Sequence, residues 1–198
     1  YFAHYYKRYL QFLDEPAITS NDIVMLGNSL TEGGGDWGKR LGKDNVINRG
    51  ISGDVAMGIY DRLHQILPGK PKQIFLLIGV NDISHDLSTD SIVQMIEKNV
   101  TRIQRESPET KLYLQSLLPI DESFNRYKKL TNKTYQIPEI NDRLKALAKE
   151  KKIDFIDLYP LFTEKGTNVL RKELTYDGLH LKEEGYKIWV DAIKKKMK

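Results

Sequence analysis

Short runs of consecutive apolar residues alternate along the chain with longer stretches in which apolar residues recur every three to four positions. The runs are typical of buried strands and lie at 23–26, 46–48, 74–78, 112–118 and 153–158. The periodic stretches are typical of amphipathic helices and lie at 54–67, 89–106, 138–151 and 182–197. This alternation predicts an α/β fold, a three-layer α/β/α sandwich around a five-stranded parallel sheet.

No repeat, low-complexity tract or linker divides the chain, so we expect a single domain spanning residues 1–198. Residues 1–15 are rich in aromatic side chains and predict an N-terminal helix. Its apolar positions with helical spacing are Phe2, Tyr5, Tyr6, Tyr9, Leu10 and Leu13. We expect this helix to pack on the domain, and a surface for a partner or a homodimer is the alternative. A polar loop at 121–136 contains Tyr127, Tyr135 and several lysines, and is either a lid or a solvated insertion.

Composition excludes several classes of function. The chain has no cysteine, which rules out disulfides, a thiolate nucleophile and Cys-ligated metal sites. Its net charge of +4 is too small to favour a nucleic-acid partner. No apolar run reaches the roughly 18 residues that a transmembrane helix needs, so we expect no membrane insertion. Because the chain starts at Tyr1 rather than Met, we expect a bacterial protein exported to the periplasm or beyond after loss of a signal peptide, with the cytoplasm as the alternative.

Polar residues and glycines follow the predicted strands, at the edge where open parallel sheets bind their ligands. Four short segments carry them, three directly after strands and one near the C-terminus. They are Gly27-Asn28-Ser29-Leu30, Gly50-Ile51-Ser52-Gly53-Asp54, Gly79-Val80-Asn81-Asp82 and Asp177-Gly178-Leu179-His180. Between them they offer a hydroxyl, an amide, small residues for close approach and an Asp/His pair.

These residues suffice for nucleophilic acyl transfer. A serine hydroxyl such as that of Ser29 is a weak nucleophile until a base takes its proton, and His180 can be that base. Asp177 lies three residues before His180, so its carboxylate can reach the imidazole, fix its tautomer and stabilise the imidazolium. Simpler explanations exist for each residue alone: Ser29 as a helix N-cap and Asp177 as a cap or turn residue.

The negative charge that develops on the substrate oxygen needs hydrogen-bond donors directed at it. The candidates for this oxyanion hole are the backbone N–H groups of Ser29 and Gly53 and the side-chain amide of Asn81. Gly53 lacks a Cβ and so lets the backbone come close to a ligand. A glycine at a helix start and an asparagine in a plain turn are the simpler explanations.

With these residues in place, the sequence resembles the SGNH hydrolases, also called the GDSL-type esterase/lipase superfamily. The name-giving residues correspond to Ser29, Gly53, Asn81 and His180, and the resemblance covers roughly residues 20 to 195. It implies an esterase with a flavodoxin-like sheet, no cofactor, a triad of Ser29, His180 and Asp177, and an oxyanion hole made by Ser29, Gly53 and Asn81.

The chain departs from the family pattern at Asn28, where the family has an aspartate. Asn28 keeps the capacity to accept a backbone hydrogen bond but loses the charge, and it is not the triad aspartate. Thr31 stands where a Gly-x-Ser-x-Gly elbow would have its second glycine, which argues against the α/β-hydrolase fold. The remaining histidines do not have the spacing of metal ligands, so no metal site is expected. They are His4, His64 and His85.

Within the superfamily, the short chain and Leu117-Leu118-Pro119 resemble platelet-activating-factor acetylhydrolases and sialate O-acetylesterases. This implies a small-molecule ester substrate, with acetyl groups on a carbohydrate the favoured class. Three alternatives remain: a lysophospholipase or thioesterase acting on longer chains, a non-catalytic carbohydrate-binding module on the same fold, and a nucleotide-binding protein with Gly33-Gly34-Gly35 as a phosphate cradle.

Overall fold

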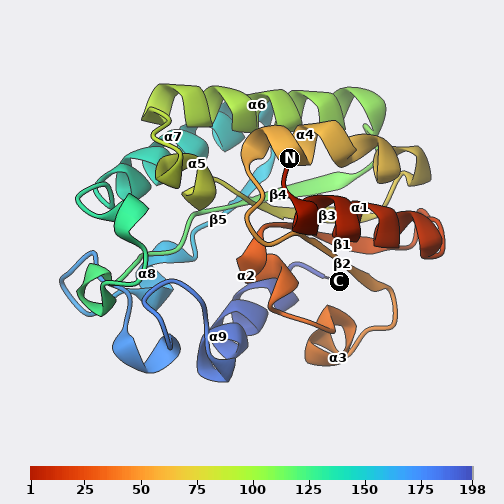
Figure 1. Ribbon diagram of the computed structural model, residues 1–198. Helices are drawn as coiled ribbons and strands as arrows, with labels where there is room; N and C mark the ends of the chain where they lie inside the picture. The colour runs from red at the N-terminus through yellow and green to blue at the C-terminus, as the bar shows by residue number, and fades with distance from the viewer. Residues whose placement is uncertain (198) are drawn as a thin grey trace.

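The computed structural model describes residues 1–197 and contains five strands and nine α-helices within them (Figure 1). The strands are β1 (Ile23–Gly27), β2 (Val46–Gly50), β3 (Gln73–Leu77), β4 (Lys111–Gln115) and β5 (Asp154–Ile156). The longer helices are α1 (Ala3–Asp14), α4 (Ala56–Arg62), α6 (Thr89–Glu106), α7 (Gln136–Lys151) and α9 (Glu183–Lys194). The short helices are α2 (Ser29–Glu32), α3 (Trp37–Leu41), α5 (Val80–Ser84) and α8 (Tyr159–Phe162).

The five strands form one parallel sheet in the order β2-β1-β3-β4-β5. The predicted fold class, a three-layer α/β sandwich with a five-stranded parallel sheet, is therefore confirmed. From β1 the chain crosses first to β2 on one side and then to β3 on the other, so the direction of winding changes at β1. The crevice outside the carboxyl ends of strands at such a switch point is where open α/β sheets bind ligands.

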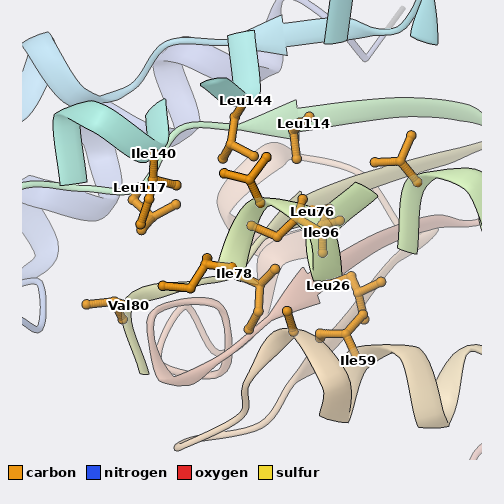
Figure 2. Close-up of a cluster of buried hydrophobic side chains, with 14 of the residues drawn as sticks. Leu26, Ile59, Leu76, Ile78, Val80, Ile96, Leu114, Leu117, Ile140 and Leu144 are labelled. Atoms are coloured by element: carbon orange, nitrogen blue, oxygen red, sulfur yellow. The ribbon is translucent and has the colours of Figure 1, made fainter. Parts of the chain in front are cut away.

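Both faces of the sheet are covered, and alternate strand residues face opposite layers. Val24, Leu26 and Leu76 belong to a core cluster beneath α4, α6 and α7, part of which is drawn in Figure 2. Met25 and Phe75 belong to a second cluster on the other face, together with residues of α3, α8 and α9. Apolar residues on both faces explain why the strands appear in the sequence as continuous apolar runs.

The N-terminal helix α1 buries a different face from the one that the spacing of apolar residues indicates. Tyr5 and Phe12 are buried and form a small cluster with Ile51, whereas Leu10 and Leu13 are more than half exposed. The Tyr5 hydroxyl donates to the carbonyl of Gly58 at 2.8 Å. The Tyr5 hydrogen bond and two buried rings, Tyr5 and Phe12, two turns apart, thus determine which side of α1 faces the domain.

Several element boundaries also differ from the sequence-based expectation. The helix expected at 54–67 begins at Ala56 and ends at Arg62, and 3₁₀ turns follow it. Asp54 is therefore not in the first turn of that helix but in the loop before it. The strand expected at 112–118 ends at Gln115. Within residues 1–197, no helix is both long and apolar enough to cross a lipid bilayer.

Candidate functional site

Ser29 lies just past the carboxyl end of β1, between β2 and β3 in the sheet, and is the first residue of the short helix α2. Asn28, not Ser29, caps this helix, because its side-chain oxygen accepts the N–H of Leu30 at 3.0 Å. Capping the helix needs a hydrogen-bond acceptor but no charge, so an asparagine at position 28 can stabilise this turn as well as an aspartate. Its cap leaves the Ser29 hydroxyl available for another partner.

That partner is His180, which comes from a loop 151 residues further along the chain. His180 Nε2 lies 2.9 Å from Ser29 Oγ, and His180 Nδ1 lies 2.7 Å from Asp177 Oδ2. Ser29, His180 and Asp177 therefore form a continuous chain of hydrogen bonds. This is the geometry in which an imidazole can accept a hydroxyl proton while a carboxylate holds its opposite nitrogen.

The side chain of Asp177 is buried, with only 5% of its surface exposed. Its second oxygen, Oδ1, accepts hydrogen bonds from the backbone. Oδ1 accepts the N–H groups of Leu179 at 2.9 Å and of His180 at 2.7 Å. Burial alone would raise the pKa of Asp177, but hydrogen bonds from Tyr127, His180 and these backbone groups lower it to about 2. Asp177 is therefore a carboxylate at every pH at which the imidazole of His180 could act as a base.

Gly53 and Asn81, the other expected oxyanion-hole residues, are tied to the strand ends by a short network. The N–H of Ile51 donates to the carbonyl of Gly27 at 3.1 Å, which fixes the Gly53 loop against the end of β1. The Asn81 side chain donates one N–H to the carbonyl of Asp54 at 2.9 Å. Within residues 1–197 the other N–H of that amide has no protein acceptor, so it can donate to a substrate oxygen.

Gly53 adopts a positive φ of 84°, a conformation that costs other residues strain. A Cβ at this position would also lie 2.8 Å from the Phe2 ring at the start of α1. The backbone conformation therefore favours glycine at residue 53, and any larger residue would also displace the Phe2 ring.

Replacing Asn81 with alanine tests its expected role as a donor. We expect kcat for ester hydrolysis to fall by roughly 10² to 10³-fold, the usual effect of removing one oxyanion-hole donor. KM should change little, because the interaction strengthens as charge develops. Steady-state kinetics with p-nitrophenyl acetate measure both constants, and a kcat within about threefold of the wild type would contradict this role.

A buried ion pair that no sequence pattern indicates is formed by Asp54, the residue after Gly53, and Arg62. Arg62 is fully buried, and its Nε donates to Asp54 Oδ2 at 2.9 Å. Its two other nitrogens donate to the carbonyls of Arg49 at 2.8 Å and Gly27 at 3.0 Å. Burial raises the pKa of Asp54 to about 6, although the Arg62 charge opposes the shift. One guanidinium thus links the ends of β1 and β2 to the residue that follows Gly53.

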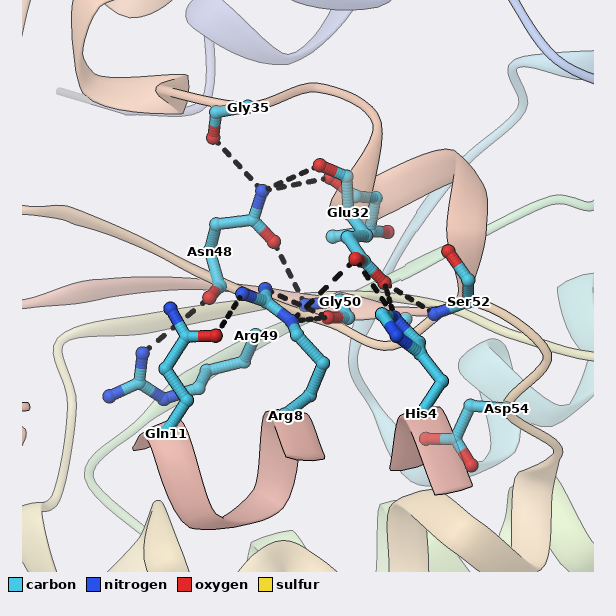
Figure 3. Close-up of polar contacts among 12 residues, drawn as sticks. His4, Arg8, Gln11, Glu32, Gly35, Asn48, Arg49, Gly50, Ser52 and Asp54 are labelled. Carbon is cyan, nitrogen blue, oxygen red and sulfur yellow. Dashed lines mark hydrogen bonds and ion pairs between the residues drawn. The ribbon is translucent and has the colours of Figure 1, made fainter. Parts of the chain in front are cut away.

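A second network connects α1 to the same loop, as Figure 3 shows. The Glu32 carboxylate, at the end of α2, accepts the N–H of Ser52 at 2.5 Å and lies 3.0 Å from His4 Nε2. Arg8 donates to the carbonyl of Gly50 at 3.1 Å. Partial burial alone would raise the pKa of Glu32, but the hydrogen bonds from His4 and Ser52 and the nearby charge of Arg8 lower it. Helix α1 is therefore fastened to the loop that precedes Gly53.

Of the three glycines at 33–35, Gly33 and Gly34 are explained by close packing against aromatic side chains. A Cβ on Gly33 would lie 2.5 Å from the Tyr186 hydroxyl, and one on Gly34 would lie 2.3 Å from Trp37. These contacts with aromatic side chains, not a bound phosphate, explain why small residues are needed. Among residues 1–197 no group of three or more His, Cys, Asp or Glu side chains is arranged to hold a metal ion.

The model of the GDSL-like Lipase/Acylhydrolase family matches residues 25–188. A platelet-activating-factor homologue from Streptococcus pneumoniae is 26% identical, with 98% of this chain and 93% of that chain covered and a TM-score of 0.88. An acetyl xylan esterase structure is 22% identical, covers 89% of this chain and 100% of that one, and has a TM-score of 0.74.

Among curated proteins, the N-acylneuraminate cytidylyltransferase of Escherichia coli O18:K1:H7 is 26% identical over 177 residues. The match covers 87% of this chain but only 39% of that longer protein. The family model runs from within β1 through β5 and includes the segments that carry Ser29, Gly53, Asn81 and His180. The chain belongs to the GDSL-like lipase/acylhydrolase family and is a carboxylic ester hydrolase.

Proposed function

We propose that this protein is a serine esterase that removes short acyl groups, acetyl above all, from carbohydrates. The observation that carries the proposal is the unbroken hydrogen-bond chain from Ser29 Oγ through His180 to Asp177. In this proposal Ser29 is the nucleophile, His180 the general base and then acid, and Asp177 the group that orients His180. Ser29, Gly53 and Asn81 supply the donors of the oxyanion hole.

The reaction proceeds by acylation and deacylation. His180 Nε2 takes the Ser29 proton as Oγ bonds to the ester carbonyl carbon, and the carbonyl electron pair moves to oxygen. The backbone N–H groups of Ser29 and Gly53 and the Asn81 amide stabilise that oxyanion. Its collapse breaks the ester C–O bond, and His180 returns the proton to the departing alcohol. Water, activated by the same imidazole, then releases the acid and restores Ser29.

The substrate class is supported by the relatives. One solved relative is an acetyl xylan esterase, and the curated relative acts on N-acylneuraminate, an acylated acidic sugar. Since the chain spans 39% of the length of that curated relative, its cytidylyltransferase activity is not carried over. Both names refer to sugars that carry an acyl group, as an ester in acetyl xylan and as an amide in N-acylneuraminate.

A screen for acyl release tests the proposal. Acetylated sialic acids, acetylated xylo-oligosaccharides and p-nitrophenyl esters from acetyl to octanoyl are incubated with the wild type and with Ser29→Ala as the blank. We expect Ser29-dependent acetate release from at least one sugar and activity that falls as the acyl chain lengthens. Activity that instead rises toward octanoyl would favour the lysophospholipase or thioesterase alternative.

A further inference from the structure

The loop at 121–136 lies directly against the segment that carries the candidate triad. The N–H of Asp121 donates to the carbonyl of Gly178 at 2.9 Å. Gly178 has a φ of 90°, and a Cβ there would lie 2.4 Å from the carbonyl oxygen of Asp121 and 3.1 Å from Phe124. The loop therefore packs backbone to backbone on Gly178, one of the two residues between Asp177 and His180.

This loop brings Tyr127 to the hydrogen bond between Asp177 and His180. Tyr127 Oη lies 2.6 Å from Asp177 Oδ2 and 2.9 Å from His180 Nδ1. The Tyr127 ring meets the imidazole edge to face, with centroids 5.7 Å apart. On the other side, the exposed Tyr176 ring stacks on His180 at 6.2 Å.

The directions of these hydrogen bonds follow from the chemistry. For His180 Nε2 to accept the Ser29 proton, Nδ1 must carry the ring proton and donate it to Asp177 Oδ2. Burial and the neighbouring carboxylate raise the pKa of Tyr127, so its hydroxyl stays protonated and donates to the same oxygen. Asp177 Oδ2 thus accepts from two groups, and the Tyr127 oxygen lies beside the Nδ1 proton.

We propose that Tyr127 is a positioning residue that acts through Asp177: its hydroxyl holds the carboxylate in line with His180 and sets the pH range of the enzyme. The inference rests on the proposed function of the triad. The charged and titratable groups that face the Asp177–His180 pair are Tyr127, Tyr176 and Arg126. Of these, Tyr127 alone donates a side-chain hydroxyl to the carboxylate among the described residues.

The test compares Tyr127→Phe with the wild type over a range of pH. Phenylalanine keeps the ring against His180 and removes only the hydroxyl. Because hydrogen bonds to charged groups are strong, we expect kcat for p-nitrophenyl acetate to fall about tenfold with KM changed less than about twofold. The acid limb of the kcat/KM profile should move to higher pH, because a carboxylate with one donor fewer attracts the imidazolium more strongly.

Tyr135→Phe is the matched control, since Tyr135 follows in the same loop, is mostly exposed and has no hydroxyl hydrogen bond within residues 1–197. It should leave kcat and the pH profile unchanged. In an Asp177→Ala background, adding Tyr127→Phe should change kcat less than about twofold, because the acceptor is already gone. A similar drop in both backgrounds, or a drop without a shift of the acid limb, would show a purely structural role and overturn the inference.

Failure of this inference is distinguishable from failure of the proposed function. If the wild type hydrolyses p-nitrophenyl acetate and Tyr127→Phe matches it at every pH, only the role of Tyr127 is refuted. If the wild type does not hydrolyse the ester and Ser29 does not react with a fluorophosphonate, the triad itself is refuted, and with it the basis for the role of Tyr127.

Discussion

Replacing Ser29 with alanine will reduce ester hydrolysis by roughly 10³-fold or more, the usual consequence of removing an activated nucleophile. The hydroxyl that lies 2.9 Å from His180 Nε2 is lost, and no other side chain occupies its place in the hydrogen-bond chain. The fold should be unaffected, because the Asn28 cap of α2 and the backbone around residue 29 remain. The initial rate with p-nitrophenyl acetate measures the effect.

Ser20→Ala is the matched control for this prediction. Ser20 lies exposed in the turn before β1, so the same chemical change is made away from the site. Both variants should unfold at the wild-type temperature, and only Ser29→Ala should lose activity. Activity retained in Ser29→Ala would mean that another group attacks the ester.

Replacing Arg62 with methionine will lower the free energy of unfolding by about 3–5 kcal/mol. This is the range typical for removing one partner of a buried ion pair while the other stays in place. The substitution leaves the Asp54 carboxylate buried without its partner at 1% exposure. It also removes the Arg62 hydrogen bonds to the carbonyls of Arg49 and Gly27, of which the Gly27 carbonyl keeps the N–H of Ile51 as a donor. Urea unfolding monitored by circular dichroism measures the loss.

Arg105→Met is the control, because Arg105 is 65% exposed and pairs with Glu106 at the surface. Exposed pairs of this kind contribute about 0–1 kcal/mol, so little change is expected. Adding Asp54→Asn to Arg62→Met should recover part of the lost stability, because the uncompensated charge is removed. A loss no larger than that of Arg105→Met would show that the buried pair does not hold the strand ends together.

The fold was predictable from the sequence because its signals are local. Strands with apolar residues on both faces and helices with regular spacing alternate, and only a parallel α/β sandwich accommodates both. The sequence also predicts that residues directly after the strands lie at one edge of the sheet, because parallel strands have their carboxyl ends on the same side. Ser29, Gly53 and Asn81 follow from that rule, and Asp177 with His180 from their spacing.

Tyr127 and Arg62 could not be identified in the same way. Tyr127 lies in an irregular loop whose path depends on the contact between Asp121 and Gly178, which no periodicity encodes. Arg62 lies within a helix, where an arginine normally reaches solvent, and only the meeting of three segments buries it. The buried face of α1 was misjudged for a related reason, because exposed leucines share its spacing.

Identification of the residue that reacts with a fluorophosphonate is the decisive test of whether Ser29 is the nucleophile. The labelled wild type is digested, and the modified peptide is sequenced by mass spectrometry, with His180→Ala as a control for activation by the imidazole. We expect a single adduct, on Ser29, and a greatly slowed reaction in the His180 variant. An adduct on any other residue, or none under conditions that label a known serine esterase, would contradict this role of Ser29.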